Sequence, residues 1–94
     1  MTYLDELAAQ IAERVPRELL PDEDTAPLFR IYALLALVKG TEVTAADVHD
    51  AWAVWMSDRD PDHRSLKPFD ELDAETKRSD EPFVEAIRGA ARAR

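Results

Sequence analysis

The chain contains no cysteine and only two glycines among its 94 residues. The absence of cysteine excludes a disulfide framework and any thiolate metal site, and it fits a reducing compartment. Two isolated glycines, Gly40 and Gly89, cannot build a phosphate-cradling loop. The sequence also lacks the GxSxG and HExxH motifs of hydrolases and metalloproteases. These absences remove the most familiar catalytic centres from consideration.

Positive charge is also scarce, since the formal net charge is −8. Such a field repels phosphate backbones, so we expect no nucleic-acid partner. The apolar run at 31–38 is too short to span a bilayer, which needs about 20 residues. The first ten residues carry acids where a secretory signal carries a basic region and an apolar core. We therefore expect a cytoplasmic protein without a membrane partner. Nine arginines against three lysines, together with abundant alanine, suggest a GC-rich source genome, such as that of an actinobacterium or its phage.

Strictly alternating apolar and polar positions, which are typical of strands, are missing as well, and this predicts an all-α fold. Ninety-four residues make one domain, which we place at 1–94. Its most apolar stretch, PLFRIYALLALVK, leaves no polar face when wound as a helix and is interrupted only by Arg30 before Lys39. A helix that is apolar all round is usually buried. We expect a small bundle of four main helices around a buried central helix at about 26–39.

Capping signals predict where the other helices begin and end. Thr2 and Thr44 are each followed three residues later by an aspartate, a variant of the capping box. The turn PDEDT at 21–25 should hold the cap of the central helix, at Asp24 or Thr25. Further boundaries are expected at Pro16, at Gly40 as a left-handed C-cap, at Pro61, at Asp73 and at Asp80.

A charged loop, SDRDPDHRSLK, follows the helix that begins near Thr44. Irregular segments on a rigid scaffold often carry binding residues. The segment 68–72 after it reads as an apolar plug. We expect Leu66, Phe69 and Leu72 to anchor this loop against Trp52 and the central helix.

The candidate functional side chains are two imidazoles, two indoles and a few cations. His49 and His63 match no metal-ligand spacing, so we expect no metal; as structural residues, His49 would lie half-buried beside Trp52 and His63 would bond to backbone. Trp52 and Trp55 can stack on a planar ligand or pack in the core, and core packing is the more common case. Arg30 should pair with an acid such as Asp24 or Glu71, although an anion anchor is an alternative. The loop is locally basic through Arg59, His63, Arg64 and Lys67.

Residues 46–87 resemble the RyR domain, the repeat domain first described in ryanodine receptors. The family pattern is a histidine and a tryptophan on one helix, a loop histidine, a proline-aromatic-x-x-leucine plug and a second helix. The matching positions here are Val48, His49, Trp52, His63, Leu66, Pro68, Phe69, Glu71, Leu72, Lys77 and Asp80. The segment between the helix and the loop histidine, 53–62, is shorter than in family members.

The resemblance implies binding rather than catalysis, because RyR domains are non-enzymatic modules that form peripheral clamps in the channels. Bacterial versions are suspected of sensing nucleotide-like ligands. The first hypothesis is therefore a non-enzymatic binding module of RyR type for a nucleotide-like anionic ligand. Its candidate ligand-binding residues are His49, Trp52, His63, Arg64 and Lys67. No cofactor and no catalytic residue are expected, because no two groups are set out as nucleophile and base.

The alternative is an acidic protein-interaction or inhibitor factor, phage-encoded, that acts on a host protein through its surface. Acidic proteins can occupy sites built for nucleic acid, although acids on outer helix faces are more often simply solvated. The partner is then a protein rather than a small anionic ligand. We expect a monomer in either case, with a homodimer left open because small all-α domains often keep an apolar patch.

Overall fold

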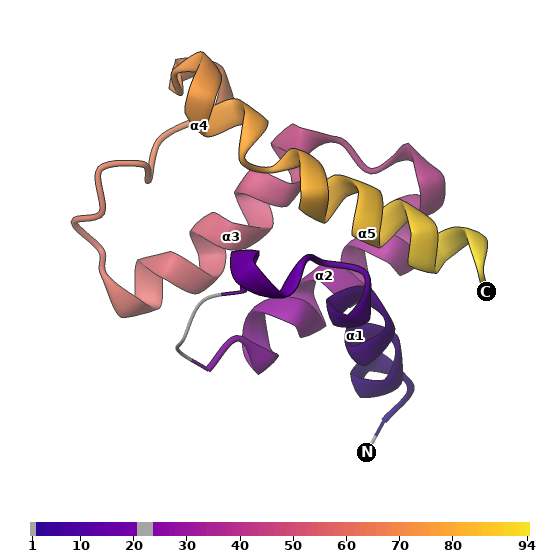
Figure 1. Ribbon diagram of the computed structural model, residues 1–94. Helices are drawn as coiled ribbons and strands as arrows, with labels where there is room; N and C mark the ends of the chain where they lie inside the picture. The colour runs from indigo at the N-terminus through magenta and orange to yellow at the C-terminus, as the bar shows by residue number, and fades with distance from the viewer. Residues whose placement is uncertain (1, 21–23) are drawn as a thin grey trace.

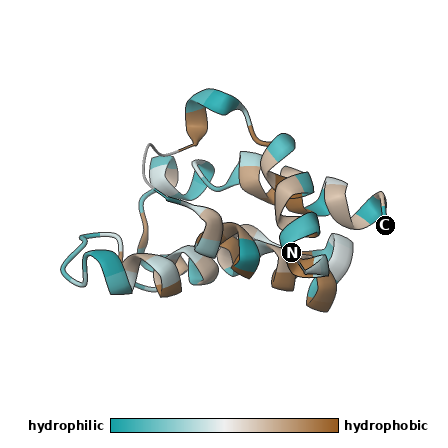
Figure 2. Cartoon of the chain, turned by 90° about the horizontal axis from the view of Figure 1, so that it is seen from below, coloured by the Kyte–Doolittle hydropathy of each residue, from teal (hydrophilic) through white to brown (hydrophobic). Residues whose placement is uncertain are grey.

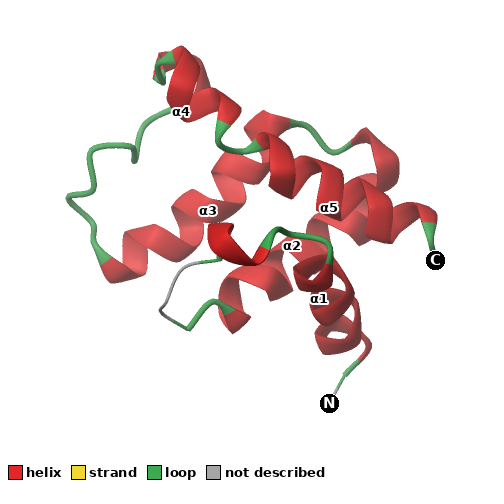
Figure 3. Cartoon of the chain, viewed as in Figure 1, coloured by secondary structure: helices red, strands yellow, loops and turns green. Residues whose placement is uncertain are grey.

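The computed structural model describes residues 2–20 and 24–94, and all regular structure within these ranges is helical. The predicted all-α fold is confirmed (Figures 1 and 3). The α-helices are α1 Tyr3–Glu13, α2 Ala26–Lys39, α3 Ala45–Arg59, α4 Ala74–Arg78 and α5 Glu81–Arg92. Short 3₁₀ turns lie at Arg17–Leu19, Gly40–Glu42 and Phe69–Glu71. Four of the helices form the body of the molecule, and the short α4 stands apart from it.

Side-chain capping starts α1 and α3 where the sequence predicts. The Thr2 amide donates to the Asp5 carboxylate at 3.0 Å, and the Thr2 hydroxyl accepts from the Asp5 amide. Thr44 and Asp47 form a second complete capping box, with bonds of 2.9 and 3.2 Å. Each box satisfies two amides that a helix N-terminus leaves without partners. Both predicted capping boxes are confirmed.

The cap of α2 is simpler than the sequence suggests. Thr25 occupies the N-cap position without a side-chain hydrogen bond, while the Asp24 carboxylate accepts from the Ala26 amide at 3.0 Å. The rest of the predicted PDEDT turn, 21–23, lies outside the described residues. At the other end, Gly40 has a φ of 60° and a ψ of −130°. Only glycine adopts this backbone region without strain, so the predicted glycine end of the helix is confirmed, although the conformation is not the left-handed helical one.

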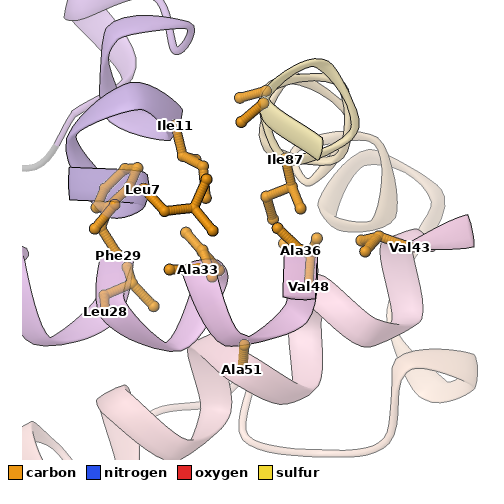
Figure 4. Packing of buried hydrophobic residues seen from close by; sticks show 14 of the residues in the cluster. Leu7, Ile11, Leu28, Phe29, Ala33, Ala36, Val43, Val48, Ala51 and Ile87 are labelled. Atoms are coloured by element: carbon orange, nitrogen blue, oxygen red, sulfur yellow. The ribbon is translucent and has the colours of Figure 1, made fainter. Parts of the chain in front are cut away.

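The central position of α2 is confirmed, since it packs against α1, α3 and α5. Ala33 and Ala36 of α2 are fully or almost fully buried, and their small side chains let the neighbouring helices approach closely. Ile11 of α1 and Ile87 of α5 point into the space over this part of α2 (Figure 4). In this part of the core, large side chains of the outer helices pack on small side chains of the central one, while Leu28, Phe29 and Tyr32 supply large side chains at its N-terminal half.

The prediction that α2 is buried on all sides is wrong. Leu34 and Val38 are 53% and 72% exposed, and Arg30, one turn before Leu34, is exposed too. Three neighbouring helices cannot close the full circumference of a fourth, so one stripe at i, i+4 spacing is left open. Arg30 pairs with an acid, as expected, but the acid is Asp5, at 3.3 Å, and not Asp24 or Glu71.

The plug after the charged loop is also placed differently from the prediction. Leu72 is buried and Phe69 is half-buried, but neither belongs to the main hydrophobic cluster around α2. Phe69 instead lies 6.2 Å from the His49 ring, and the Lys77 ammonium lies 5.4 Å from its centroid. The plug therefore seals α3 against the loop and α4 and does not reach the central helix.

Two further features of the fold are the hydrophilic loop after α3 and the modest length of the helices. The loop that follows α3 forms a hydrophilic end of the molecule in the hydropathy colouring (Figure 2). Within 2–20 and 24–94, no helix is long and apolar enough to cross a membrane.

Candidate functional site

A cavity of about 360 Å³ opens between α2, α3, α4 and the beginning of α5. Aromatic side chains supply much of its wall. Tyr32 and Phe83 face each other across α2 and α5, with ring centroids 5.9 Å apart. The described residues that line the cavity are Leu19, Leu28, Tyr32, His49, Trp52, Trp55, Ser65, Thr76, Ser79, Asp80 and Phe83.

Two of the five predicted site residues, His49 and Trp52, line this cavity, and a third, His63, contacts Trp52. His49 stacks on Trp52 with centroids 5.6 Å apart, and His63 meets the Trp52 ring edge-on with centroids 5.0 Å apart. His49 is buried, and its Nε2–H donates to the Lys67 carbonyl oxygen at 2.7 Å. His63 Nδ1 accepts from the Ser65 amide at 3.0 Å. Both imidazoles thus hold the loop in place, as expected of structural histidines.

The other two predicted residues, Arg64 and Lys67, line a second and smaller cavity of about 220 Å³. Both side chains are exposed, and both lie near the Asp73 carboxylate. The pKa of Asp73 is lowered, first by the hydrogen bonds from Thr76 at the start of α4, and further by the charges of Lys67 and Arg64. Ser65 and Thr76 line both cavities, so the aromatic cavity and the basic cavity adjoin.

Asp80 is a cavity residue that sequence reasoning missed. It takes the predicted N-cap position of α5, but its side chain makes no capping hydrogen bond. The carboxyl is half-buried, and burial raises its pKa to about 6; Glu81 raises it further, whereas nearby His49 opposes the shift. Burial also raises the pKa of the Tyr32 hydroxyl, and the charge of Asp80 adds to that effect. The aromatic cavity therefore carries a carboxylate, while the adjoining basic cavity carries the two cations.

Like the Asp80 carboxyl, the Trp55 indole carries a polar group without a hydrogen-bond partner among the described residues. Its Nε1–H is buried and finds no acceptor among the described residues, although buried polar groups are nearly always paired. The Arg59 guanidinium lies 4.4 Å from the Trp55 ring centroid and donates to the Asp24 carbonyl oxygen at 2.7 Å. These contacts hold the ring in place and leave its N–H without a partner.

The model of a protein family matches residues 2–92, and that family is described as a domain of unknown function, DUF7701. The chain belongs to this family. The match extends over α1 and α2 as well as over the later helices. No curated protein and no solved structure matches the chain.

Membership in the DUF7701 family overturns the resemblance of residues 46–87 to the RyR domain, which is wrong. The positions that carried the resemblance have local packing roles. His49 and His63 both contact the Trp52 ring, and the segment around Phe69 and Leu72 packs beside the loop. A similar order of residues can meet such local needs in unrelated helical domains, so it does not establish descent.

Nothing in the sequence pattern of this DUF7701 chain marks Asp80, Tyr32 or Thr76 as cavity residues. Asp80 looks like an ordinary N-cap, and Tyr32 looks like one more apolar position of the central helix. Within the described ranges, no group of three or more histidines, aspartates or glutamates could hold a metal ion.

The raised pKa of Asp80 means that its ionised carboxylate destabilises the folded state. Its folded pKa of about 6 exceeds the reference value of 3.8, so the folded state binds the proton more tightly than the unfolded state. The tighter binding of this proton stabilises the folded state below about pH 4, and that contribution is lost as the pH rises to about 6. Such a shift corresponds to about 3 kcal/mol for a fully buried group, and solvent screening of a half-exposed one reduces it to about 1–2 kcal/mol.

Asp80→Asn is therefore expected to raise the free energy of unfolding at pH 7 by about 1–2 kcal/mol and to flatten its pH dependence between pH 4 and 6. Urea denaturation at pH 4, 5, 6 and 7 measures both effects. Asp70→Asn is the matched control, because Asp70 is exposed and outside the cavity. An Asp80→Asn variant that is less stable at pH 7 would contradict the assignment.

Proposed function

We propose that the chain is a non-enzymatic binding domain for a small ligand that carries a planar ring and an anionic group, as nucleotides do. The observation that carries the proposal is the junction of an aromatic cavity with a basic one at Ser65 and Thr76. A ring placed in the first cavity would have its anionic group beside Arg64 and Lys67 in the second.

The aromatic cavity has the size and lining of a ligand site. Small-molecule sites are commonly apolar clefts of about 300–1,000 Å³ with a few convergent polar groups. This cavity holds about 360 Å³, which suits one ring system rather than a large ligand. Trp52 is half-buried and lines the cavity, and it contacts the rings of both His49 and His63. A planar ligand would therefore contact an indole whose orientation is already set.

The basic cavity supplies the charge. Arg64 and Lys67 are exposed, so they can approach an anion without the cost of desolvating a buried cation. A guanidinium binds phosphate or carboxylate oxygens through two parallel N–H bonds, and an ammonium adds a compact positive charge. The backbone around them is ordered by the His49 bond to the Lys67 carbonyl oxygen. In a chain of net charge −8, this local arrangement favours a small anion over a nucleic-acid backbone.

The proposal assigns no catalysis to the site. Both imidazoles are engaged with backbone groups of the loop, His49 as donor and His63 as acceptor. A general base needs a free nitrogen close to the reacting proton. His63 offers no such nitrogen, because its Nδ1 accepts a bond and its Nε2 then carries the proton. His49 keeps a lone pair on Nδ1, but no hydroxyl of the described residues donates a hydrogen bond to it.

The test uses purine nucleoside monophosphates and the double variant Arg64→Gln/Lys67→Gln. Wild-type protein is expected to gain thermal stability with ligand, and the double variant should bind at least about tenfold more weakly, because charge-assisted bonds to the anion are lost. Arg92→Gln/Arg94→Gln is the matched control, since it removes two charges at the far end of α5. Thermal shift and calorimetry measure the effect. If no nucleotide raises the melting temperature at millimolar concentration, or both double variants weaken binding equally, the proposal fails.

The second candidate is the acidic protein-interaction factor. One observation favours it, namely the exposed stripe of Leu34 and Val38 on α2, flanked by Arg30. Exposed aliphatic side chains one turn apart can serve as a contact for another protein. This candidate gains weight if the nucleotide screen is negative, and it predicts that Val38→Asp abolishes partner binding without altering the aromatic cavity. The monomeric state and a cytoplasmic location stay predictions from the sequence.

A further inference from the structure

We infer that the aromatic cavity selects a ring with two adjacent N–H donors that face Asp80, and therefore guanine in preference to adenine. This inference rests on the proposed function and deepens it by naming the ligand class. The inference is based on the Asp80 carboxylate, which lines the aromatic cavity without a hydrogen-bond donor among the described residues. The proposed function assigns no role to this carboxylate.

The Asp80 carboxylate has no hydrogen-bond donor of its own in the parts of the chain that the structure describes. It stands at the N-cap of α5 without a capping bond, and it lines the cavity while half-buried. An ionised carboxylate only accepts hydrogen bonds, and its two oxygens accept two parallel ones. A half-buried acceptor of this kind is best satisfied by two donors set side by side.

The donors must come largely from the ligand. No lysine or arginine is among the described residues that line this cavity. The charge of His49 acts on Asp80, but its Nε2–H is donated to the Lys67 carbonyl oxygen, and no hydrogen bond joins its ring to Asp80 among the described residues. Glu81, on the other side of Asp80, only adds negative charge. The hydroxyls of Tyr32, Ser65, Thr76 and Ser79 remain, and none of them offers two donors on one rigid edge.

Ring chemistry then separates the purines. Guanine presents N1–H and the 2-amino group side by side, which matches both oxygens of a carboxylate. Adenine presents one amino donor beside the N1 acceptor, which would face the carboxylate with like polarity. Guanine also brings the O6 acceptor, and Trp55, whose buried N–H has no partner among the described residues, lines the same cavity. A small movement of the side chains around the ligand would give the Asp80 carboxylate and the Trp55 N–H each a hydrogen-bond partner.

The test measures calorimetric affinities of guanosine, inosine and adenosine 5′-monophosphates for the wild type and for Asp80→Asn. We expect the guanosine nucleotide to bind at least about tenfold more tightly than the adenosine nucleotide, as bidentate pairs typically discriminate. Inosine, which lacks the 2-amino group, should lie between them. Asp80→Asn should remove most of the preference, because an amide offers one acceptor and places a donor against the second N–H. Asp70→Asn, a change at an exposed position of the 3₁₀ turn Phe69–Glu71 outside this cavity, should leave the preference unchanged.

The outcomes separate this inference from the proposed function. Equal affinity for guanosine and adenosine nucleotides, unchanged by Asp80→Asn, overturns the inference and leaves the binding domain standing. Failure of all three nucleotides to bind overturns both. Tight binding of a quaternary amine such as choline, lost in Asp80→Asn, together with no nucleotide binding, would assign the aromatic wall and the carboxylate to cation recognition and overturn the guanine assignment. Because Asp80→Asn is expected to fold at least as stably as the wild type, a failure to fold does not obscure these results.

Discussion

Ile87→Ala is expected to lower the free energy of unfolding by about 2–5 kcal/mol, which is a large share of the stability of a domain of this size. Ile87 is fully buried on α5 and lies in the main cluster with Ile11 of α1 (Figure 4). The residues of α2 beneath it, Ala33 and Ala36, are too small to fill the space that Ile87 would leave. The cost is therefore expected near the upper end of that range.

Chemical denaturation monitored by circular dichroism measures this change. Leu34→Ala is the matched control, since it removes a similar volume from a side chain that is 53% exposed. Its effect should stay below about 1 kcal/mol, because most of the side chain is already in water. Comparable losses in the two variants would show that α5 does not close the core as the structure places it.

The fold was largely predictable because its signals are local. Thr2 with Asp5 and Thr44 with Asp47 satisfy helix amides within four residues, so sequence spacing alone identifies them. The exposure of Leu34 and Val38 was not predictable in this way. Hydropathy tells which positions are able to be buried, whereas the number of neighbouring helices decides which positions are covered.

The same distinction between local signals and tertiary arrangement applies to the residues of the candidate site. His49 and Trp52 share one face of α3 because they are three residues apart, so their contact follows from spacing. The role of Lys67 in holding His49 belongs to its backbone carbonyl, which no side-chain pattern reveals. Asp80 has the residue type of an N-cap, and only the tertiary structure shows that its carboxyl makes no capping bond and lines a cavity.

Trp52→Ala is expected to lower the free energy of unfolding by about 2–4 kcal/mol and to abolish ligand binding. The loss is somewhat below that of a fully buried tryptophan, because Trp52 is only half-buried. Without the indole, the ring of His49 loses its stacking partner and His63 loses the ring that it meets edge-on. The loop that presents Arg64 and Lys67 would then be held mainly by hydrogen bonds. Denaturation and calorimetric titration measure the two effects.

Trp52→Phe separates the structural share of that effect from the binding share. A phenyl ring keeps an aromatic contact for both imidazoles but offers a smaller face to the cavity, so stability should recover by more than half. Val54→Ala, an exposed change on the same helix, should alter neither quantity by more than about 0.5 kcal/mol. If Trp52→Phe restores stability while nucleotide affinity stays at least about tenfold reduced, the indole face contacts the ligand directly. If stability and affinity recover together, Trp52 acts on binding only by positioning the loop, and the ligand ring must lie against Tyr32 and Phe83 instead.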